Sequence, residues 1–206
     1  MTAKSRNTII QVAKTLFGEK GFNDTSVREI AKRGKVNVAM IAYYFGCKEK
    51  LYESVLQEFA HEKYQDIRVI LTSPQNEEDF KNKIQQLIAK MMTNYSEDAA
   101  LLKILIREMN ADKTKAQKGL VEVVSPFFLA MKNFFQAAID QKIISEKYSD
   151  KNSADILALL FLAVLSHPVQ SEVPIKRNLG MTLHDEHFQK IYSEHLLSLF
   201  FNGVLK

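Results

Sequence analysis

The sequence predicts an all-α protein of about nine helices, and three observations lead to that fold class. Apolar residues recur at three- and four-residue spacing along most of the 206 residues. Helix-capping residues followed by acids precede several of these segments. No stretch alternates apolar and polar residues as a half-buried strand does. The expected helices span residues 5–20, 27–32, 38–44, 48–71, 77–94, 97–110, 114–141, 153–166 and 185–202.

The first three expected helices form one module. Residues 5–20 read as an amphipathic helix, and Gly21 is the residue type that ends one. Ser26 is a suitable N-cap for the second helix, with Glu29 three residues later, and Asn37 is a suitable N-cap for the third. Helices of about two turns are unstable alone in water, so packing against the first helix must hold them.

Two short helices joined by a tight turn form a helix-turn-helix, which places its second helix in the major groove of DNA. The charge distribution agrees with this reading. Residues 1–51 carry ten Lys and Arg against four Asp and Glu, whereas the remainder carries 18 against 20. A basic module on a nearly neutral body suits phosphate binding by the first part, although charge alone would also fit a solvated basic face.

The residues of this module resemble the TetR (tetracycline-repressor) family of bacterial regulators. That family combines a short helix of the pattern Thr-Ser-Val-x-x-Ile-Ala with a turn, a recognition helix ending in aromatic residues, and a Lys-Glu-x-Leu segment. The matching positions are Thr25, Ser26, Val27, Ile30, Ala31, Tyr44, Phe45, Lys48, Glu49 and Leu51. The motif covers roughly the first quarter of the chain, and the rest matches in helical layout and length.

Three positions depart from the family pattern. Lys35 stands in the turn where the family usually has Gly, so it must take a left-handed conformation or the turn must differ. Ala42 replaces a Tyr that often touches phosphate, and Cys47 replaces the usual Ser or Thr cap. A redox role for Cys47 beside a helix start is conceivable on chemical grounds, but a small residue tolerated at a cap is the favoured account.

The candidate DNA-binding residues lie on and around the expected recognition helix. Arg28 and Lys48 suit phosphate contacts. The start of the recognition helix lacks hydrogen-bond donors, which favours apolar contact with thymine methyl groups. Adjacent tyrosines cannot both face inward, so Tyr43 is expected outside. The full set is Ser26, Arg28, Asn37, Val38, Ala39, Met40, Tyr43, Tyr44 and Lys48.

The remaining chain is expected to form a second domain. The predicted limits are residues 1–50 for the helix-turn-helix domain and 51–206 for a helical body, with the 48–71 helix connecting them. Pro126 should kink its helix or mark its start, and Pro168 should end the 153–166 helix. A polar connection of about seventeen residues then leads to the last helix.

The family resemblance implies a small effector, apolar or cationic, bound in this body. A bundle core would use the same large apolar residues, so each one could simply be packing. Glu108 could face a cationic ligand or pair with a nearby base. The candidate pocket residues are Met91, Glu108, Phe127, Met131, Phe134, Phe135 and Phe161.

The resemblance also implies a homodimer on a palindromic operator. Residues 153–166 are apolar nearly all round, and 186–201 carry a wide apolar stripe, so pairing both with their copies would build a four-helix interface. The candidate interface residues are Leu157, Phe161, Leu165, Tyr192, His195, Leu196 and Leu199.

Composition narrows the class of protein. One cysteine rules out an intrachain disulfide and suits a reducing compartment. No signal peptide is recognised, and the longest apolar run, 156–165, is too short to span a bilayer, so a cytoplasmic protein is expected. The sequence shows no phosphate-binding loop, nucleophile elbow or Cys-x-x-Cys, so we expect no enzyme activity, no cofactor and no metal.

The resulting prediction is a sequence-specific DNA-binding transcriptional regulator. The resemblance implies a repressor that a small-molecule effector releases from its operator. The alternative is a helical carrier or sequestering protein for apolar molecules, with a helix-turn-helix that it no longer uses. Lys35 in the turn and the donor-poor recognition helix keep this alternative open.

Overall fold

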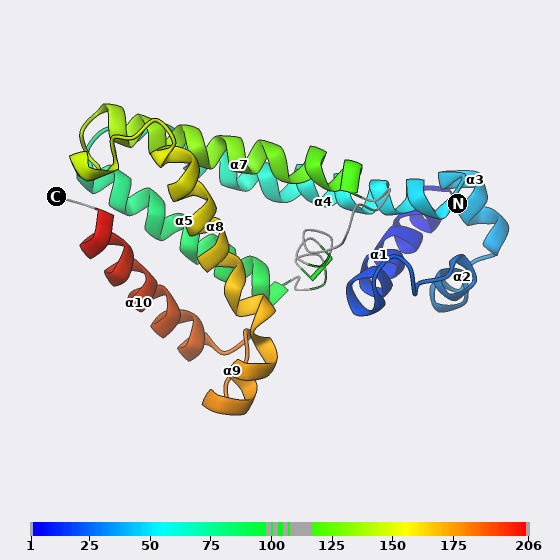
Figure 1. Cartoon of the computed structure of the whole chain (residues 1–206). Coiled ribbons are helices and arrows are strands. Elements are labelled where there is room, and N and C mark those ends of the chain that lie inside the picture. The colour runs from blue at the N-terminus through cyan, green and yellow to red at the C-terminus, as the bar shows by residue number, and fades with distance from the viewer. Residues whose placement is uncertain (1, 98–99, 101–102, 105–106, 108–116, 205–206) are drawn as a thin grey trace. The chain divides into compact units, whose positions relative to one another are not determined.

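The structure, a computed structural model, describes residues 2–97, 100, 103–104, 107 and 117–204 (Figure 1). Within these ranges the regular elements are helices, and no strand occurs, which confirms the all-α prediction. The helices are α1 (Thr2–Lys20), α2 (Val27–Gly34), α3 (Val38–Phe45), α4 (Lys48–Ile70), α5 (Glu77–Glu97), α7 (Gln117–Asp140), the 3₁₀-helix η1 (Glu146–Tyr148), α8 (Ser153–Gln170), α9 (Glu172–Leu179) and α10 (Glu186–Val204).

The chain divides into two compact units. The first comprises residues 1–63 with 98–124, and the second comprises 64–97 with 125–206. The boundaries of these units differ from the predicted ones, which placed one domain in residues 1–50 and the other in residues 51–206. The expected helix over 97–110 falls largely outside the described residues, although Ala100, Lys103, Ile104 and Arg107 are helical.

The first unit is built around the buried face of α1. Ile9, Leu16 and Phe17 are at most 1% exposed and pack with Ile30 of α2 and Ile41 of α3. The same core includes Leu51, Tyr52, Val55 and Leu56 of α4, together with Ile104. The short helices α2 and α3 are therefore held by burial of their apolar faces, as their length requires.

The end of α1 lies against the segment that contains Ala100. A Cβ added to Gly18 would come within 2.7 Å of the Ala100 carbonyl oxygen, so only glycine permits this approach. Nearby, Arg107 Nη1 donates a hydrogen bond to the Phe17 carbonyl oxygen at 3.1 Å. Residues that follow α5 in sequence thus pack as part of the helix-turn-helix unit.

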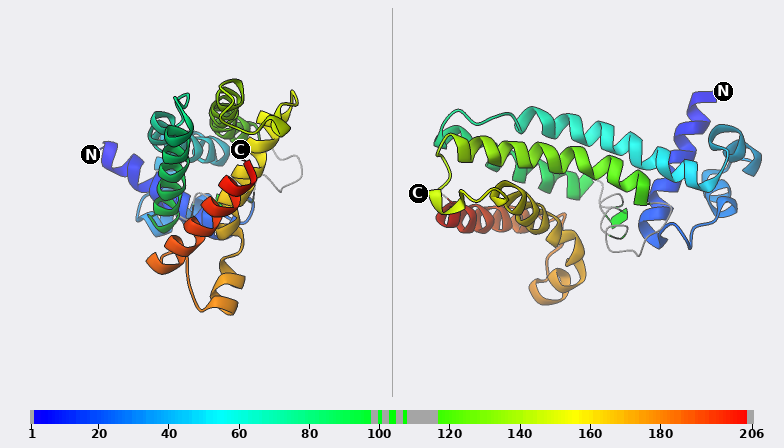
Figure 2. Two further views of the ribbon diagram at one scale, coloured as in Figure 1. Left: turned by 90° about the vertical axis from the view of Figure 1, so that its left-hand side faces the viewer. Right: turned by 45° about the horizontal axis from the view of Figure 1, so that its top comes forward.

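The second unit contains an aromatic core. α5 packs against α10 and against α8 (Figures 1 and 2). Phe80 of α5 stacks on Phe134 of α7 with ring centroids 5.2 Å apart, and Phe161 of α8 meets Phe200 of α10 at 5.1 Å. Phe135 joins the two pairs, at 6.3 Å from Phe80 and 5.9 Å from Phe161.

The prediction that Pro168 ends its helix is wrong, because α8 continues to Gln170. Pro126 lies inside α7, and the kink expected there stays a prediction. A proline has no N–H for the carbonyl four residues earlier, which for Pro168 is the carbonyl of Val164. The Tyr192 hydroxyl donates to that oxygen at 2.6 Å, so a side chain from α10 replaces the lost helix bond.

The same region contains a helix that the sequence reading missed. The polar connection expected before the last helix includes α9, which Gly180 ends in the left-handed conformation. Among the described helices, α8 is the one whose length of 18 residues and apolar composition would permit a membrane crossing. Phe161 on its inner face is nevertheless part of the aromatic core, and 44% of the helix is buried.

Gly18→Ala should destabilise the protein by about 1–3 kcal/mol, because the new methyl group meets a backbone oxygen that cannot move away. Gly34→Ala is the matched control, since its Cβ would lie 3.7 Å from the nearest atom, an ordinary contact. That change should be neutral or stabilising by up to about 1 kcal/mol. Urea unfolding of both variants measures the difference. Equal stability of the two variants would contradict the close packing at Gly18.

Candidate nucleic-acid interface

The helix-turn-helix is fixed by caps at each end of its two helices. Ser26 is the N-cap of α2, and its hydroxyl accepts from the Glu29 backbone N–H at 3.1 Å. Asn37 is the N-cap of α3, and its side chain accepts from the Ala39 N–H at 2.8 Å. Both predicted caps are confirmed, so the start of each helix is set locally by sequence.

The turn between the helices is closed by Lys35 in the left-handed conformation, with φ 51° and ψ 40°. Its N–H donates to the Lys32 carbonyl at 3.3 Å, and the Val36 N–H donates to the Ala31 carbonyl at 3.0 Å. This pair of bonds is the Schellman arrangement that usually has glycine at its left-handed position. The sequence prediction for Lys35 is confirmed, and the turn retains its geometry at a modest conformational cost.

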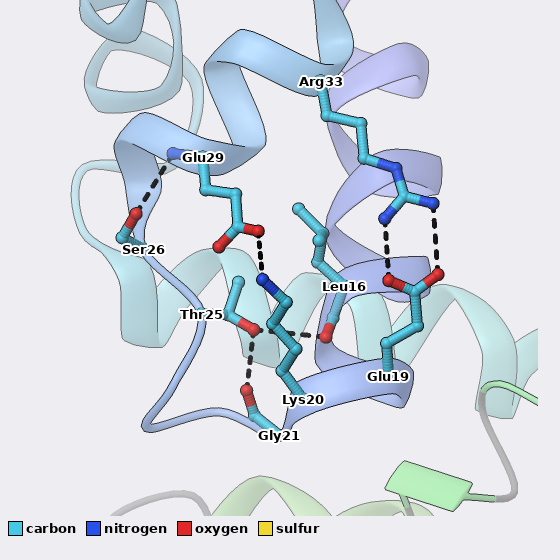
Figure 3. A network of polar contacts seen from close by, with 8 residues as sticks. All are labelled: Leu16, Glu19, Lys20, Gly21, Thr25, Ser26, Glu29 and Arg33. Atoms are coloured by element: carbon cyan, nitrogen blue, oxygen red, sulfur yellow. Dashed lines mark hydrogen bonds and ion pairs between the residues drawn. The ribbon is translucent and has the colours of Figure 1, made fainter.

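Ion pairs hold α1 and α2 together (Figure 3). Arg33 makes two hydrogen bonds to the Glu19 carboxylate, at 2.7 and 3.1 Å, and Lys20 donates to Glu29. The hydrogen bond from Arg33 lowers the pKa of Glu19 below its usual value. Because the side chains of Arg33 and Glu19 are 48% and 47% exposed, the pair fixes orientation more than it adds stability.

Thr25 joins the helix-turn-helix to the end of α1. It is 1% exposed, and its hydroxyl lies 3.2 Å from the Leu16 carbonyl oxygen and 2.7 Å from that of Gly21 (Figure 3). Leu16 lies within α1, four residues before its last residue, and Gly21 follows the helix, so one hydroxyl ties the loop before α2 to both sides of the helix end. The first residue of the sequence motif is therefore structural.

The outward face of α3 carries most of the predicted DNA-binding residues. Asn37, Val38 and Ala39 are exposed, and Met40 is half-buried. Tyr43 is 80% exposed, as predicted, while Tyr44 is half-buried with its ring centroid 5.1 Å from that of Tyr43. The helix thus offers methyl groups, one thioether and phenol rings, with Ile41 and Phe45 buried behind them.

Arg28 and Lys48, the residues predicted to contact phosphates, lie on α2 and α4, the helices before and after α3 in the chain. Ser26 and Arg28 are exposed on and before α2. Lys48, at the start of α4, is half-buried. Its Nζ lies 4.3 Å from the centroid of the Phe22 ring and donates to the Asn23 carbonyl at 3.4 Å. These contacts hold the ammonium group near the first turn of α4, where backbone N–H groups also favour anions.

The predicted pocket residues lie in the core of the second unit. Met91, Met131, Phe134, Phe135 and Phe161 are at most 8% exposed, and Phe127 is half-buried. Glu108 lies outside the described residues. Five of the seven are therefore buried, Phe135 contacts both Phe134 and Phe161, and the role of the set as ligand contacts stays a prediction.

The predicted dimer residues divide into two groups. Leu157, Phe161, Leu165 and Leu196 are at most 7% exposed, covered by their own chain, and so are unavailable to a second copy. Tyr192 is half-buried and bonded to Val164, while His195 and Leu199 are exposed. Helical spacing alone does not distinguish the inner from the outer face of α8, so the set of interface residues stays a prediction. The large apolar residues that α8 exposes, which the sequence reading passed over, are Ile156, Leu159, Leu160 and Val164.

The comparisons with known proteins agree with this geometry. The family model described as bacterial regulatory proteins, tetR family, matches residues 9–55. A probable HTH-type transcriptional regulator of Bacillus subtilis, YttP, is 30% identical over 196 residues, covering 95% of this chain and 92% of that protein. The HTH-type transcriptional repressor KstR2 of Mycolicibacterium smegmatis is 33% identical over 75 residues, covering 35% of this chain and 37% of that protein.

A similar fold is found among solved structures. A proposed fatty acid metabolism regulator of Clostridium perfringens superposes with a TM-score of 0.78 at 18% identity, over 97% of this chain and 99% of that one. The match extends through both units, so the helical body as well as the helix-turn-helix has this fold.

Thr25→Val should lower the free energy of unfolding by about 1–2 kcal/mol, because it removes a buried hydroxyl from two carbonyl groups while keeping the side-chain shape. Thr15→Val is the control, since the Thr15 hydroxyl bonds the Gln11 carbonyl in an exposed part of α1. Its cost should be within about 0.5 kcal/mol. Chemical unfolding of both variants measures this, and a Thr25 variant as stable as the control would refute the anchoring role.

Proposed function

The chain belongs to the tetR family of bacterial regulatory proteins, and we propose that it is a homodimeric repressor released from a palindromic operator by a small effector. Membership makes it a helix-turn-helix transcriptional regulator, as its relatives are, and not a member of an enzyme family. Such a regulator works on DNA in the cytoplasm. The observation that carries the proposal is the capped, outward-facing α3 on a basic module.

Recognition by α3 relies on shape and apolar contact. Val38 and Ala39 can meet thymine methyl groups in the major groove, and the exposed Tyr43 can reach the backbone or a base edge. Asn37 is engaged in capping through its side-chain oxygen, so its amide nitrogen is the polar group it offers. Arg28 and Lys48 supply charge to phosphates on either side, which fixes the register of the helix on DNA.

The exposed stripe on α8 supports the dimer. Ile156, Leu159, Leu160 and Val164 recur at helical spacing and are 39–58% exposed. Leu199 of α10 adds a further side chain, 76% exposed. Apolar residues repeated along one helix face favour burial against a partner, and a second copy of the same stripe would be self-complementary.

Release follows from the geometry that a dimer imposes. Two recognition helices must match half-sites separated by about one turn of DNA, roughly 34–36 Å, or a multiple of it. An effector that binds better to a form with another spacing shifts the population away from DNA. Ala100 packs on Gly18, and Arg107 donates to the Phe17 carbonyl. Both residues follow α5 of the body in the chain, which supports the proposal that effector binding in the body changes the helix-turn-helix through them.

The first experiment is a salt titration of binding to the DNA immediately upstream of the protein's own gene, with scrambled DNA as control. Arg28→Ala combined with Lys48→Ala should weaken binding to both DNAs and reduce the salt slope by about two. Lys176→Ala, on exposed α9, is the charge control and should leave the slope unchanged. If the wild-type protein bound the upstream DNA and the scrambled DNA equally, and a genome-wide selection found no preferred sequence, the regulator hypothesis would be contradicted and the carrier hypothesis favoured.

The dimer is tested by placing charge on the stripe. Leu160→Glu should convert the protein to a monomer in sedimentation analysis and reduce operator affinity at least tenfold, because two carboxylates would face each other in the interface. Leu129→Glu on α7 is matched in exposure, 54% against 58%, and should remain dimeric. A dimeric Leu160 variant would show that the interface lies elsewhere.

A further inference from the structure

Asn94 is a buried amide in an apolar setting. It lies near the end of α5, is 4% exposed, and its Oδ1 accepts no hydrogen bond in the described part of the chain. The residues seven and three positions earlier, Leu87 and Met91, share its helix face and are also buried. A leucine at position 94 would continue that face without leaving a polar atom unsatisfied.

The adjacent residue, Tyr95, has a buried polar group that does find a hydrogen-bond partner. Tyr95 is 1% exposed, and its hydroxyl donates to the Leu165 carbonyl oxygen of α8. Burial raises the pKa of Tyr95, so the hydroxyl remains a neutral donor. Buried side-chain oxygens in native proteins are almost always hydrogen-bonded, to protein, water or ligand. The amide oxygen of Asn94 is therefore an acceptor for which the described residues supply no donor.

We propose that Asn94 is the polar recognition point of the effector, and that the effector is an uncharged, mostly apolar molecule with a hydroxyl or N–H donor. The inference rests on the proposed function and adds the chemical class of the ligand. A carboxamide oxygen accepts hydrogen bonds, so the group it selects is a donor.

The surroundings support a neutral ligand. The buried polar side chains described in the second unit are Asn94 and Ser153, besides the tyrosine hydroxyl already mentioned, and none of these carries a charge. A charged ligand taken into such an interior would lose its hydration without gaining a counter-ion from the described buried residues. Met91 and Met92, both buried on α5, are adaptable side chains that can pack around an apolar body.

The alternative is that a buried water molecule satisfies Asn94 and that the residue has only a structural role. The two accounts differ in ligand selectivity. A structural amide would affect folding but would not distinguish two ligands of equal size, whereas a recognition amide would favour the one that can donate.

The test uses two isomeric probes, decan-1-ol, which donates a hydrogen bond, and 1-methoxynonane, which only accepts. Binding to the full-length protein is measured by calorimetry and thermal shift. Wild type should bind decan-1-ol about tenfold more tightly than the ether, since one hydrogen bond distinguishes them. In Asn94→Leu the preference for decan-1-ol should fall to about twofold or less. The unliganded variant should melt about 2–4 °C higher than wild type, because the substitution removes a buried polar group without a hydrogen-bond partner.

Met91→Leu is the matched control on the same helix face, because it changes shape without changing polarity. It should alter binding of both probes alike and keep the preference for the alcohol. Decyltrimethylammonium, which has the same chain and a cationic head, should bind more weakly than decan-1-ol.

Each failure has its own meaning. Equal binding of the two isomers to wild type, absence of binding by either, a preference that survives Asn94→Leu, or tighter binding of the cation would each overturn the inference. Operator binding by wild type, measured in the same preparations, tests the proposed function separately. Intact operator binding with isomers bound equally would remove the effector assignment and leave the regulator standing.

Discussion

The helix-turn-helix depends on how the carbonyl groups at the end of α1 are satisfied. A backbone carbonyl has two lone pairs, so one at or near a helix end can accept a hydrogen bond from a neighbouring segment in addition to its helical bond. Here the Thr25 hydroxyl serves the carbonyls of Leu16 and Gly21, while the Phe17 carbonyl accepts from the Gly21 N–H and from Arg107. One helix end thus joins the loop before α2 to a segment that follows α5.

That constraint also determines how α3 is presented. α2 and α3 are each eight residues long, and their orientation depends on α1 and on the turn between them. The turn accepts Lys35 because its two backbone bonds outweigh a left-handed conformation that costs a non-glycine residue roughly 1–2 kcal/mol. Since both helix starts are capped by their own sequence, the exposed face of α3 is set before any DNA is bound.

Features encoded in short stretches of sequence were predictable. The caps at Ser26 and Asn37, the strained Lys35 and the outward Tyr43 follow from residue type and helical spacing alone. The inner face of α8 was not predictable, because a helix apolar on all sides gives no sign of which side its own chain covers. The extension of α8 through Pro168 was not predictable for a related reason. The hydroxyl that replaces the lost helix bond to the Val164 carbonyl belongs to Tyr192, 28 residues away along the chain.

The second unit shows two ways of treating polar atoms in an apolar core. Tyr192 and Tyr95 donate to successive carbonyls of α8, at Val164 and Leu165, so each hydroxyl both satisfies itself and ties a neighbouring helix to α8. Asn94, one residue from Tyr95, makes no such tie through its oxygen to any residue that the structure describes. If stability were the only requirement, an apolar residue would serve better at that position. A group that weakens the unliganded core and can be satisfied by a ligand gives that ligand a means of stabilising one conformation over another, which is the property an effector site requires.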